Sequence, residues 1–237
     1  MKISVVIICY NEKKNLKSLI FQSKKLIKKY KNIEVIFVNN GSSDGSNKVF
    51  DKMFGSKMLK LVSIKKNKGY GHGIICGLKK AKGDIIGWTH GDDLNFFYKF
   101  QIILNKKLKK NNFFLKGYRT GKRPFLDIFF SYGFNITSSI ILRKNLWEIT
   151  AHPTLFSKQL FIKYKKILPN DFSIDLFLYY LAKNNRYLVK RVNFPYKDRK
   201  HGVSKWNKNF LSKINLMMKY VFKIFKLLYL DVFKIIK

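Results

Sequence analysis

Short apolar runs and longer amphipathic segments alternate along residues 1–93. Uninterrupted apolar runs of this length, closed by Asn, Gly or Asp, are typical of buried strands. The predicted strands are 3–10, 33–38, 59–64 and 85–88. Between them apolar side chains recur at helical spacing, and the predicted helices are 16–30, a short one ending near 54, and 69–82. Strands that alternate with helices indicate a doubly wound, mainly parallel α/β sheet.

The pattern is less regular after residue 93. It predicts helices over 96–108 and 173–182 and strands over 113–118 and 187–194. Residues 120–170 give no clear pattern, because Pro124, Pro153 and Pro169 divide them into pieces. Since the chain has no internal repeat and no low-complexity linker, we expect one domain over residues 1–206.

The last segment, 207–237, is strongly amphipathic. On a helix of ~100° per residue, most of its lysines fall within an arc of roughly 80°, and Phe210, Phe225 and Val232 lie on the opposite side. A wide apolar face with a rim of lysines predicts a helix in a membrane interface, its lysines near anionic head groups. The alternative is a helix packed on the domain's own core. The lysines of the arc are Lys208, Lys219, Lys223, Lys226, Lys234 and Lys237.

The chain of 237 residues carries 49 Lys and Arg against 13 Asp and Glu, a formal net charge of +36. Such an excess predicts an anionic partner: nucleic acid, a membrane surface or phosphorylated substrates. Compositional bias is the alternative, because Lys, Asn, Ile and Phe are enriched together and spread evenly. The stacking platforms and basic glycine motifs of nucleic-acid binders are not visible, so we expect no nucleic-acid partner.

The cysteines and the N-terminal segment indicate the cellular compartment of the protein. Cys9 and Cys76 lie in apolar segments, which fits two buried thiols in a reducing compartment. The first apolar run is too short for a signal peptide, and no run approaches the ~20 residues of a spanning helix. We therefore expect a cytoplasmic protein, peripheral on the membrane.

The candidate chemistry begins where the predicted strand 85–88 ends, at His90-Gly91-Asp92-Asp93. Open α/β sheets bind ligands at the carboxyl ends of their strands. Carboxylate oxygens at such a place hold Mg²⁺ or Mn²⁺ against a diphosphate. The alternative is a polar turn whose Asp residues cap the next helix.

Three segments together resemble the family 2 glycosyltransferases, which have the nucleotide-sugar-binding GT-A fold. Ser4 to Glu12 is similar to the family's opening strand, which ends in Tyr-Asn-Glu. Val38 to Gly45 is similar to its Val-Asp-Asp-Gly-Ser-x-Asp-Gly turn, and Asn67 to Asp93 to its Asn-x-Gly…Ala-x-Gly-Asp segment leading into Asp-x-Asp. Arg199-x-x-Gly202-x-Ser204-Lys205 resembles a loop of the polyprenyl- and dolichyl-phosphate glycosyltransferases.

The resemblance implies a GT-A fold, a mixed and mainly parallel sheet flanked by helices, with the amphipathic tail behind it. It implies inverting transfer of a sugar from a nucleotide diphosphate sugar. The implied donor-binding residues are Tyr10, Glu12, Asn39, Gly41, Asp44, Gly69, Gly91 and Asp92. His90, Asp92 and Asp93 would hold a divalent metal, and Arg199, Ser204 and Lys205 the acceptor or the diphosphate. The implied catalytic residues are Asp92, Arg199 and Asp175, the last as general base for a hydroxyl acceptor or, alternatively, only a helix cap.

Two residues depart from the family pattern. His90 stands where the family has the first Asp of Asp-x-Asp, and Asn39 where it usually has an Asp. Both changes remove negative charge, and an imidazole suits Mn²⁺ better than Mg²⁺, so metal dependence is open. His152 and Thr154 also lie where lipid-phosphate relatives have another motif, and we expect them near the donor sugar.

The loop 199–205 and the tail favour polyprenyl phosphate, or another lipid-linked or cell-envelope glycan acceptor. Two alternatives belong to other classes of protein. One is a non-catalytic nucleotide-sugar-fold protein recruited to membranes, which the departures at His90 and Asn39 suggest. The other is a basic nucleic-acid-binding module, which rests on the net charge alone.

Overall fold

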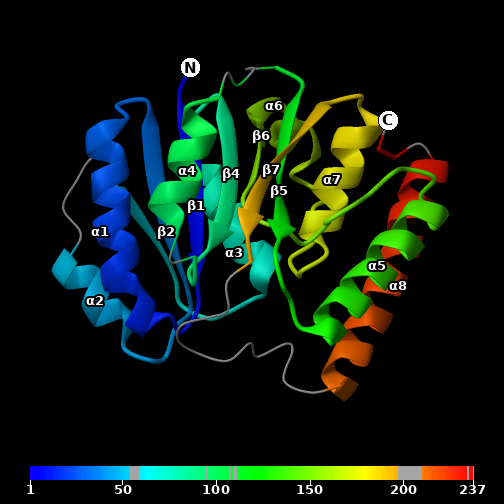
Figure 1. Cartoon of the computed structure of the whole chain (residues 1–237), viewed down its shortest axis with the longest axis horizontal. Helices are drawn as coiled ribbons and strands as arrows, with labels where there is room; N and C mark the ends of the chain where they lie inside the picture. Colours follow the sequence, from blue (N-terminus) through cyan, green and yellow to red (C-terminus); the bar gives the residue numbers. More distant parts are fainter. Residues whose placement is uncertain are drawn as a thin grey trace.

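A computed structural model of the chain describes residues 1–53, 59–93, 95–106, 108, 111–196, 210–233 and 235–236. These residues form one seven-stranded sheet in the order β3-β2-β1-β4-β6-β5-β7 (Figure 1). The strands are β1 Ile3–Cys9, β2 Ile33–Asn40, β3 Leu59–Ile64, β4 Ile85–His90, β5 Phe113–Thr120, β6 Thr154–Ser157 and β7 Leu188–Pro195. Strand β6 runs antiparallel to its neighbours β4 and β5, while the other pairs are parallel. The predicted mixed, mainly parallel sheet is confirmed.

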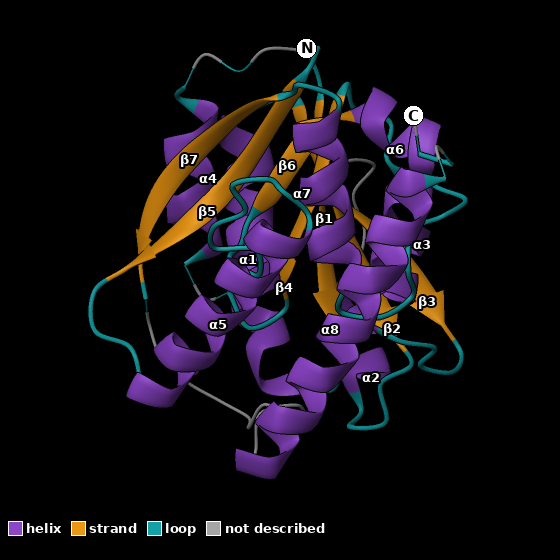
Figure 2. Ribbon diagram, turned by 90° about the vertical axis from the view of Figure 1, so that its right-hand side faces the viewer, coloured by secondary structure: helices purple, strands orange, loops and turns teal. Residues whose placement is uncertain are grey.

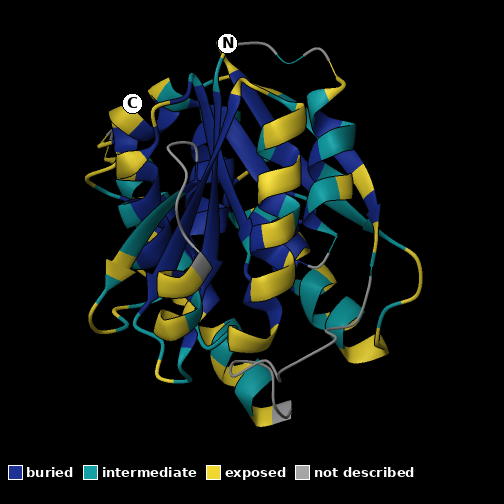
Figure 3. Ribbon diagram, turned by 90° about the vertical axis from the view of Figure 1, so that its left-hand side faces the viewer, coloured by how far each residue is buried: buried dark blue, intermediate teal, exposed yellow. Residues whose placement is uncertain are grey.

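Helices cover both faces of this sheet (Figure 2). They are α1 Lys13–Lys29, α2 Ser46–Met53, α3 Tyr70–Lys80, α4 Phe96–Leu104, α5 Phe125–Ile141, α6 Lys158–Tyr164, α7 Ile174–Asn184 and α8 Phe210–Val232. Helices α1, α2 and α4 bury apolar side chains against one face, and α3, α6, α7 and α8 against the other. The strands are buried between these layers and the outer sides of the helices are exposed (Figure 3).

Residues 120–170 contain three elements that the sequence pattern did not reveal, namely α5, β6 and α6. Pro124, interpreted as a break, lies immediately before α5, where its missing N–H removes no helical hydrogen bond. Strand β6 has only four residues and all of them are buried, so it shows no alternation of polar and apolar positions. Short, fully buried strands carry no periodic signal.

Strand β6 approaches β4 very closely. Gly87 of β4 lies opposite Leu155, and a Cβ at position 87 would come within 1.9 Å of the carbonyl oxygen of Thr154. A glycine is therefore required where the two strands meet. The approach brings His152, just before β6, next to His90 at the end of β4, with ring centroids 4.0 Å apart.

The predicted helix in the tail is confirmed as α8. It lies beside α5 at one end of the molecule (Figures 1 and 2). Its inner face, including Tyr220, Ile224 and Leu227, is buried in the core, so packing on the domain, the alternative prediction, describes this face of the helix. None of the helices in the described ranges is both long and apolar enough to cross a bilayer.

A buried carboxylate joins the strands at the sheet edge opposite their carboxyl ends. Glu34 of β2 is 1% exposed and lies 2.7 Å from Lys60 Nζ of β3. Ser4 Oγ of β1 and the backbone N–H of Lys82, before β4, each donate it a hydrogen bond of 2.6 Å. Burial alone would raise the pKa of Glu34, but these donors outweigh it and lower the pKa from 4.5 to about 2.

The lowered pKa of Glu34 predicts how stability depends on pH. Since the folded-state value lies below the unfolded one, the contribution is fully present above pH 4.5 and is lost as the pH falls through 2. The pKa difference corresponds to roughly 3 kcal/mol. Urea unfolding between pH 5 and pH 2 should show a shallower decline for Glu34→Gln than for the wild type. Asp51→Asn, an exposed change on α2, is the control, and parallel curves for wild type and Glu34→Gln would contradict the assignment.

Candidate active site

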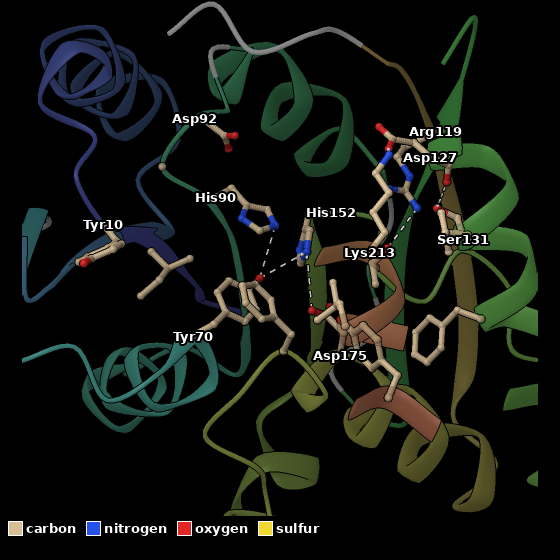
Figure 4. A pocket seen from close by; sticks show the side chains of 18 of the residues that line it. Tyr10, Tyr70, His90, Asp92, Arg119, Asp127, Ser131, His152, Asp175 and Lys213 are labelled. Carbon is tan, nitrogen blue, oxygen red and sulfur yellow. Dashed lines mark hydrogen bonds and ion pairs between the residues drawn. The ribbon is translucent and has the colours of Figure 1, made fainter. Parts of the chain in front are cut away.

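A cleft of about 460 Å³ opens at the carboxyl ends of β1 and β4 (Figure 4). Its size is within the usual range of small-molecule sites. One end is formed by the turns after β1 and β4, and the other by the end of β5 together with α5 and α8. The cleft therefore extends from the parallel half of the sheet to the two helices at the edge of the molecule.

The first end of the cleft carries the residues that follow β1 and β4. Tyr10 and Glu12 come after β1, His90 is the last residue of β4, and Asp92 follows it. Because β1 and β4 are parallel neighbours, both turns leave the sheet at the same edge. Glu12 accepts a hydrogen bond of 2.5 Å from the Asn15 side chain. An aromatic ring beside carboxylates offers a stacking surface and hydrogen-bond acceptors for a nucleoside.

A buried ion pair lies beneath the middle of the cleft. Lys116 Nζ of β5 is 2.7 Å from Asp175 Oδ1 of α7, and the two side chains are 0% and 3% exposed. Lys116 also donates a hydrogen bond of 2.9 Å to Thr154 Oγ1 of β6. Burial lowers the pKa of Lys116 and raises that of Asp175, whereas their mutual contact favours both charges. Asp175 is the member of the pair that lines the cleft.

Three rings meet above this ion pair. Tyr70, at the start of α3, stacks on His90, and its hydroxyl lies 3.4 Å from Nε2 of both His90 and His152. His152 Nε2 is 3.7 Å from Asp175 Oδ2, and Nδ1 has no hydrogen-bond partner in the described part of the chain. Burial, and next the neighbouring His90, lowers the pKa of His152 well below its usual value. The ring is therefore held neutral beside the first end of the cleft.

The second end of the cleft is basic. Arg119, at the end of β5, donates to Glu148 Oε2 at 2.6 Å, and Arg123 donates to Ser131 Oγ of α5 at 2.9 Å. Lys213 of α8 reaches into the same end and lies 2.7 Å from Asp127 Oδ1. These cations are ordered by their partners, and fixed Arg and Lys side chains in a cleft are the groups that bind phosphate.

An apolar wall continues from the basic end along the same two helices. It consists of Phe130 and Phe134 from α5 and Leu216, Met217 and Tyr220 from α8. The Phe134 and Tyr220 rings are 4.2 Å apart between centroids, so the wall is a packed surface shared by both helices. This end of the cleft therefore offers a ligand both charged and apolar side chains.

Comparison with known proteins identifies the family. The family model described as glycosyl transferase family 2 matches residues 4–165. The chain belongs to glycosyl transferase family 2. An uncharacterized glycosyltransferase of Rickettsia bellii is 35% identical over 120 residues, which are 49% of this chain and 17% of that protein. Another, from Rickettsia prowazekii, is 34% identical over 110 residues, 46% of this chain and 33% of that protein. The chain thus spans only a fraction of the length of these relatives.

Solved structures show the fold of this family 2 chain. Mannosyl-3-phosphoglycerate synthase from Rubrobacter xylanophilus superposes with a TM-score of 0.71 at 14% identity, over 95% of this chain and 73% of that one. Glucosyl-3-phosphoglycerate synthase from Mycobacterium tuberculosis, crystallised with UDP, gives 0.68 at 16% identity, over 96% and 80%. The same enzyme with Mn²⁺ and UDP-glucose gives 0.66, over 94% and 77%. The predicted GT-A fold is confirmed.

Not all of the predicted donor residues face the cleft. Asn39 accepts a hydrogen bond of 3.2 Å from the N–H of Ser42 and contacts Asn47, whereas the adjacent Asn40 lines the cleft. Asp44 accepts hydrogen bonds of 2.9 and 3.0 Å from the N–H groups of Lys13 and Ser46. It therefore ties together the starts of α1 and α2, as a carboxylate that caps helices does.

Two of the glycines predicted at the donor site, Gly41 and Gly69, are required by the backbone conformation and by close packing. Gly41 has φ +75° and Gly69 has φ +114°, conformations that favour glycine. A Cβ on Gly41 would lie 2.4 Å from the backbone nitrogen of Asn67, and one on Gly69 would lie 2.3 Å from the carbonyl oxygen of Asn170. At both positions the close neighbour is another loop of the chain. Gly91, in contrast, lines the cleft itself.

The structure brings together two of the three predicted metal ligands, His90 and Asp92. Asp93 is buried, accepts a hydrogen bond of 2.9 Å from Thr89 Oγ1 and pairs with Lys99 Nζ at 2.9 Å. Among the residues that the structure describes, no three His, Cys, Asp or Glu side chains are grouped as metal ligands. One imidazole and one carboxylate are an incomplete donor set for Mg²⁺, which prefers oxygen ligands.

The remaining predicted residues divide into two groups. Arg199, Ser204 and Lys205 lie outside the described residues. His152 and Thr154, expected near the donor sugar, lie respectively in the cleft and against Lys116 beneath it. No predicted role pointed to four further residues that line the cleft, Arg119, Arg123, Lys213 and Tyr70. The two arginines follow a predicted strand, which is a usable signal, but nothing distinguishes Lys213 among 49 basic residues.

The buried pair predicts a strongly non-additive mutant cycle. Lys116→Met should cost about 3–5 kcal/mol of unfolding free energy, because it leaves Asp175 buried without its partner. Lys116→Met with Asp175→Leu removes both charges and should regain most of that loss. Urea unfolding at pH 7 measures both variants. A loss below about 1 kcal/mol in the single variant would contradict the role of the pair.

The incomplete donor set predicts a gain of metal binding. His90→Asp supplies a second carboxylate beside Asp92 and should tighten Mn²⁺ binding at least tenfold, measured by electron paramagnetic resonance without substrate. Asp93→Asn is the matched control, since Asp93 is engaged by Thr89 and Lys99 and its loss should leave Mn²⁺ binding unchanged. Weaker Mn²⁺ binding in Asp93→Asn, with its fold intact by circular dichroism, would show that Asp93 is a ligand.

Proposed function

We propose that this chain catalyses inverting transfer of a sugar from a nucleotide diphosphate sugar to a lipid-linked phosphate acceptor. One observation carries the proposal. A single cleft is lined by the family 2 motif residues Tyr10, Glu12 and Asp92 at the ends of β1 and β4, and by the basic residues and the apolar wall at its second end. An acceptor with an anionic head and a hydrocarbon tail matches the second end.

The donor is proposed to bind at the first end. Tyr10 would stack on the base, Glu12 would hydrogen-bond the ribose, and Asp92 would lie at the diphosphate, as the family motifs imply. Structures with the same fold bind UDP and UDP-glucose, which supports a nucleotide at this edge of the sheet. Any metal would be held by His90 and Asp92 and would neutralise diphosphate charge, but no step below depends on it.

In the proposed reaction, an acceptor oxygen attacks the anomeric carbon in line as the bond to the nucleoside diphosphate breaks. A phosphate acceptor is already ionised and needs no general base. A hydroxyl acceptor would need one, and Asp175 is the candidate by its place in the cleft. Arg199, Ser204 and Lys205 keep their predicted role on the acceptor or the leaving diphosphate.

The acceptor is proposed to be polyprenyl phosphate or a related cell-envelope lipid. Arg119, Arg123 and Lys213 would bind its phosphate, and Phe130 and Met217 would contact the first part of its chain. Such a substrate resides in the bilayer, so the enzyme would work on the cytoplasmic membrane face. The basic surface and the amphipathic α8 support that placement.

Replacing Asp92 with Ala tests the donor end. Turnover should fall at least a hundredfold, because the change removes the motif carboxylate that, with His90, would hold a divalent metal against the diphosphate. Nucleoside diphosphate release under saturating donor measures the effect, and circular dichroism checks the fold. A rate within twofold of wild type would remove Asp92 from the site.

The decisive experiment for the function is a donor panel. UDP-, GDP- and dTDP-sugars are incubated with polyprenyl phosphate in detergent, with Mn²⁺ or with EDTA. The proposal expects nucleoside diphosphate release that requires the lipid phosphate. Tight nucleotide binding without release from any donor would favour the non-catalytic alternative. Nanomolar binding of nucleic acid at physiological salt, with a steep salt dependence, would favour the third.

A further inference from the structure

Helix α5 carries an apolar stripe on its outer side. Large hydrophobic side chains recur there every three or four residues, which is the spacing of one helix face. All of them are more than 40% exposed, and Phe125 and Phe129 reach 76% and 61%. The opposite side of the helix carries the buried Phe134 and lines the cleft. The stripe consists of Phe125, Phe129, Tyr132, Ile136 and Ile140.

Helix α8 carries a second stripe with the same spacing. Phe222 is 69% exposed and Met218 is 64% exposed, although Tyr220 and Ile224 beside them are buried. This helix lies beside α5 (Figures 1 and 2), so the stripes are neighbours on one end of the molecule. Most of the exposed large hydrophobic side chains of the described residues belong to these two helices and the turn after α8. The second stripe consists of Leu211, Ile214, Met218, Phe222, Phe225 and Tyr229.

The charges around the stripes are positive. Lys219 and Lys226 on α8 are exposed, as is Lys122 just before α5. The carboxylates of the two helices, Asp127 and Asp231, are half-buried and accept hydrogen bonds from Lys213 and Asn184. No carboxylate on α5 or α8 is therefore exposed beside the apolar stripes. The two stripes together form a contiguous exposed apolar patch, and such a patch on a protein surface marks an interaction site.

The charge decides between two occupants of this patch. A second copy of the chain would bring the same net charge of +36 against its own lysines, which opposes association. An anionic bilayer surface offers hydrocarbon for the stripes and negative head groups for the lysines. The chemistry therefore favours lipid over a second copy.

We infer that α5 and α8 together form a bilayer-docking platform, in which both outer stripes enter the interface of an anionic membrane. The inner sides of the same helices form the basic end and the apolar wall of the cleft. Docking thus sets the acceptor end of the cleft at the membrane surface, where a lipid acceptor enters without leaving the bilayer. This consequence rests on the proposed function, whereas membrane binding itself does not.

Vesicle binding without either substrate tests the platform. The full chain is sedimented with vesicles of phosphatidylglycerol and phosphatidylcholine, or of phosphatidylcholine alone. Phe129→Glu and Phe222→Glu should each lower the partition coefficient on the anionic vesicles at least tenfold. Phe21→Glu is the matched control, because Phe21 is 68% exposed on α1 at the other end of the molecule, and its binding should stay within twofold of wild type.

Several results would overturn the inference. Wild-type protein that does not sediment with anionic vesicles, or Phe222→Glu that binds like wild type, removes the platform. If Phe222→Glu weakens vesicle binding and Phe129→Glu does not, α5 is not part of the platform. A wild-type dimer in analytical ultracentrifugation that Phe222→Glu dissociates, without vesicle binding, assigns the patch to a second copy. Donor turnover with detergent-solubilised acceptor is measured separately, so loss of the platform and loss of the proposed reaction are distinguishable.

Discussion

The ion pair between Lys116 and Asp175 is the interaction on which the cleft depends. It joins β5 to α7 and, through the hydrogen bond to Thr154, to the antiparallel β6. Two charges removed from water are stable only as a pair, so these three elements are fixed relative to one another. On this support His152 is held against His90 and Tyr70. The ion pair therefore holds the second half of the sheet in place beside the end of the cleft formed by β1 and β4.

Helices α5 and α8, at the edge of the molecule, form the second end of the cleft. Lys213 and Met217 of α8 line the cleft while Met218 and Phe222 of the same helix are exposed outside. The side chains of α8 that line the cleft and those that are exposed thus lie on different sides of the helix. The side chains of α5 are divided in the same way. A cleft whose wall is also an apolar outer surface is suited to a substrate that is itself partly embedded in lipid.

The sequence predicted the parallel half of the fold, and it predicted which residues meet at the first end of the cleft, because both depend on local patterns. Apolar runs gave β1 to β4, and parallel strands necessarily bring their carboxyl ends to one edge, so Tyr10, Glu12 and Asp92 could be placed together. It did not reveal α5 or β6, since Pro124 opens a helix and β6 is short and fully buried. The basic end was missed for a different reason: Lys213 joins Arg119 and Arg123 only through tertiary packing of α8, which no local pattern encodes. Asn39 and Asp44 show the opposite limit of motif-based prediction. Both belong to a family motif, but their side chains accept hydrogen bonds from backbone N–H groups of the surrounding loops.

The central claim is that the acceptor phosphate binds at the basic end of this cleft. The most direct measurement is the rate of radiolabelled sugar transfer to polyprenyl phosphate, over a range of acceptor and donor concentrations, for Lys213→Ala and Lys223→Ala. Both variants lose an ion pair between α8 and the domain, to Asp127 and Asp171 respectively, but only Lys213 lines the cleft. The account predicts that Lys213→Ala raises the acceptor KM about tenfold with the donor KM within twofold, while Lys223→Ala changes neither. An unchanged acceptor KM in Lys213→Ala, or an equal rise in Lys223→Ala, would contradict it.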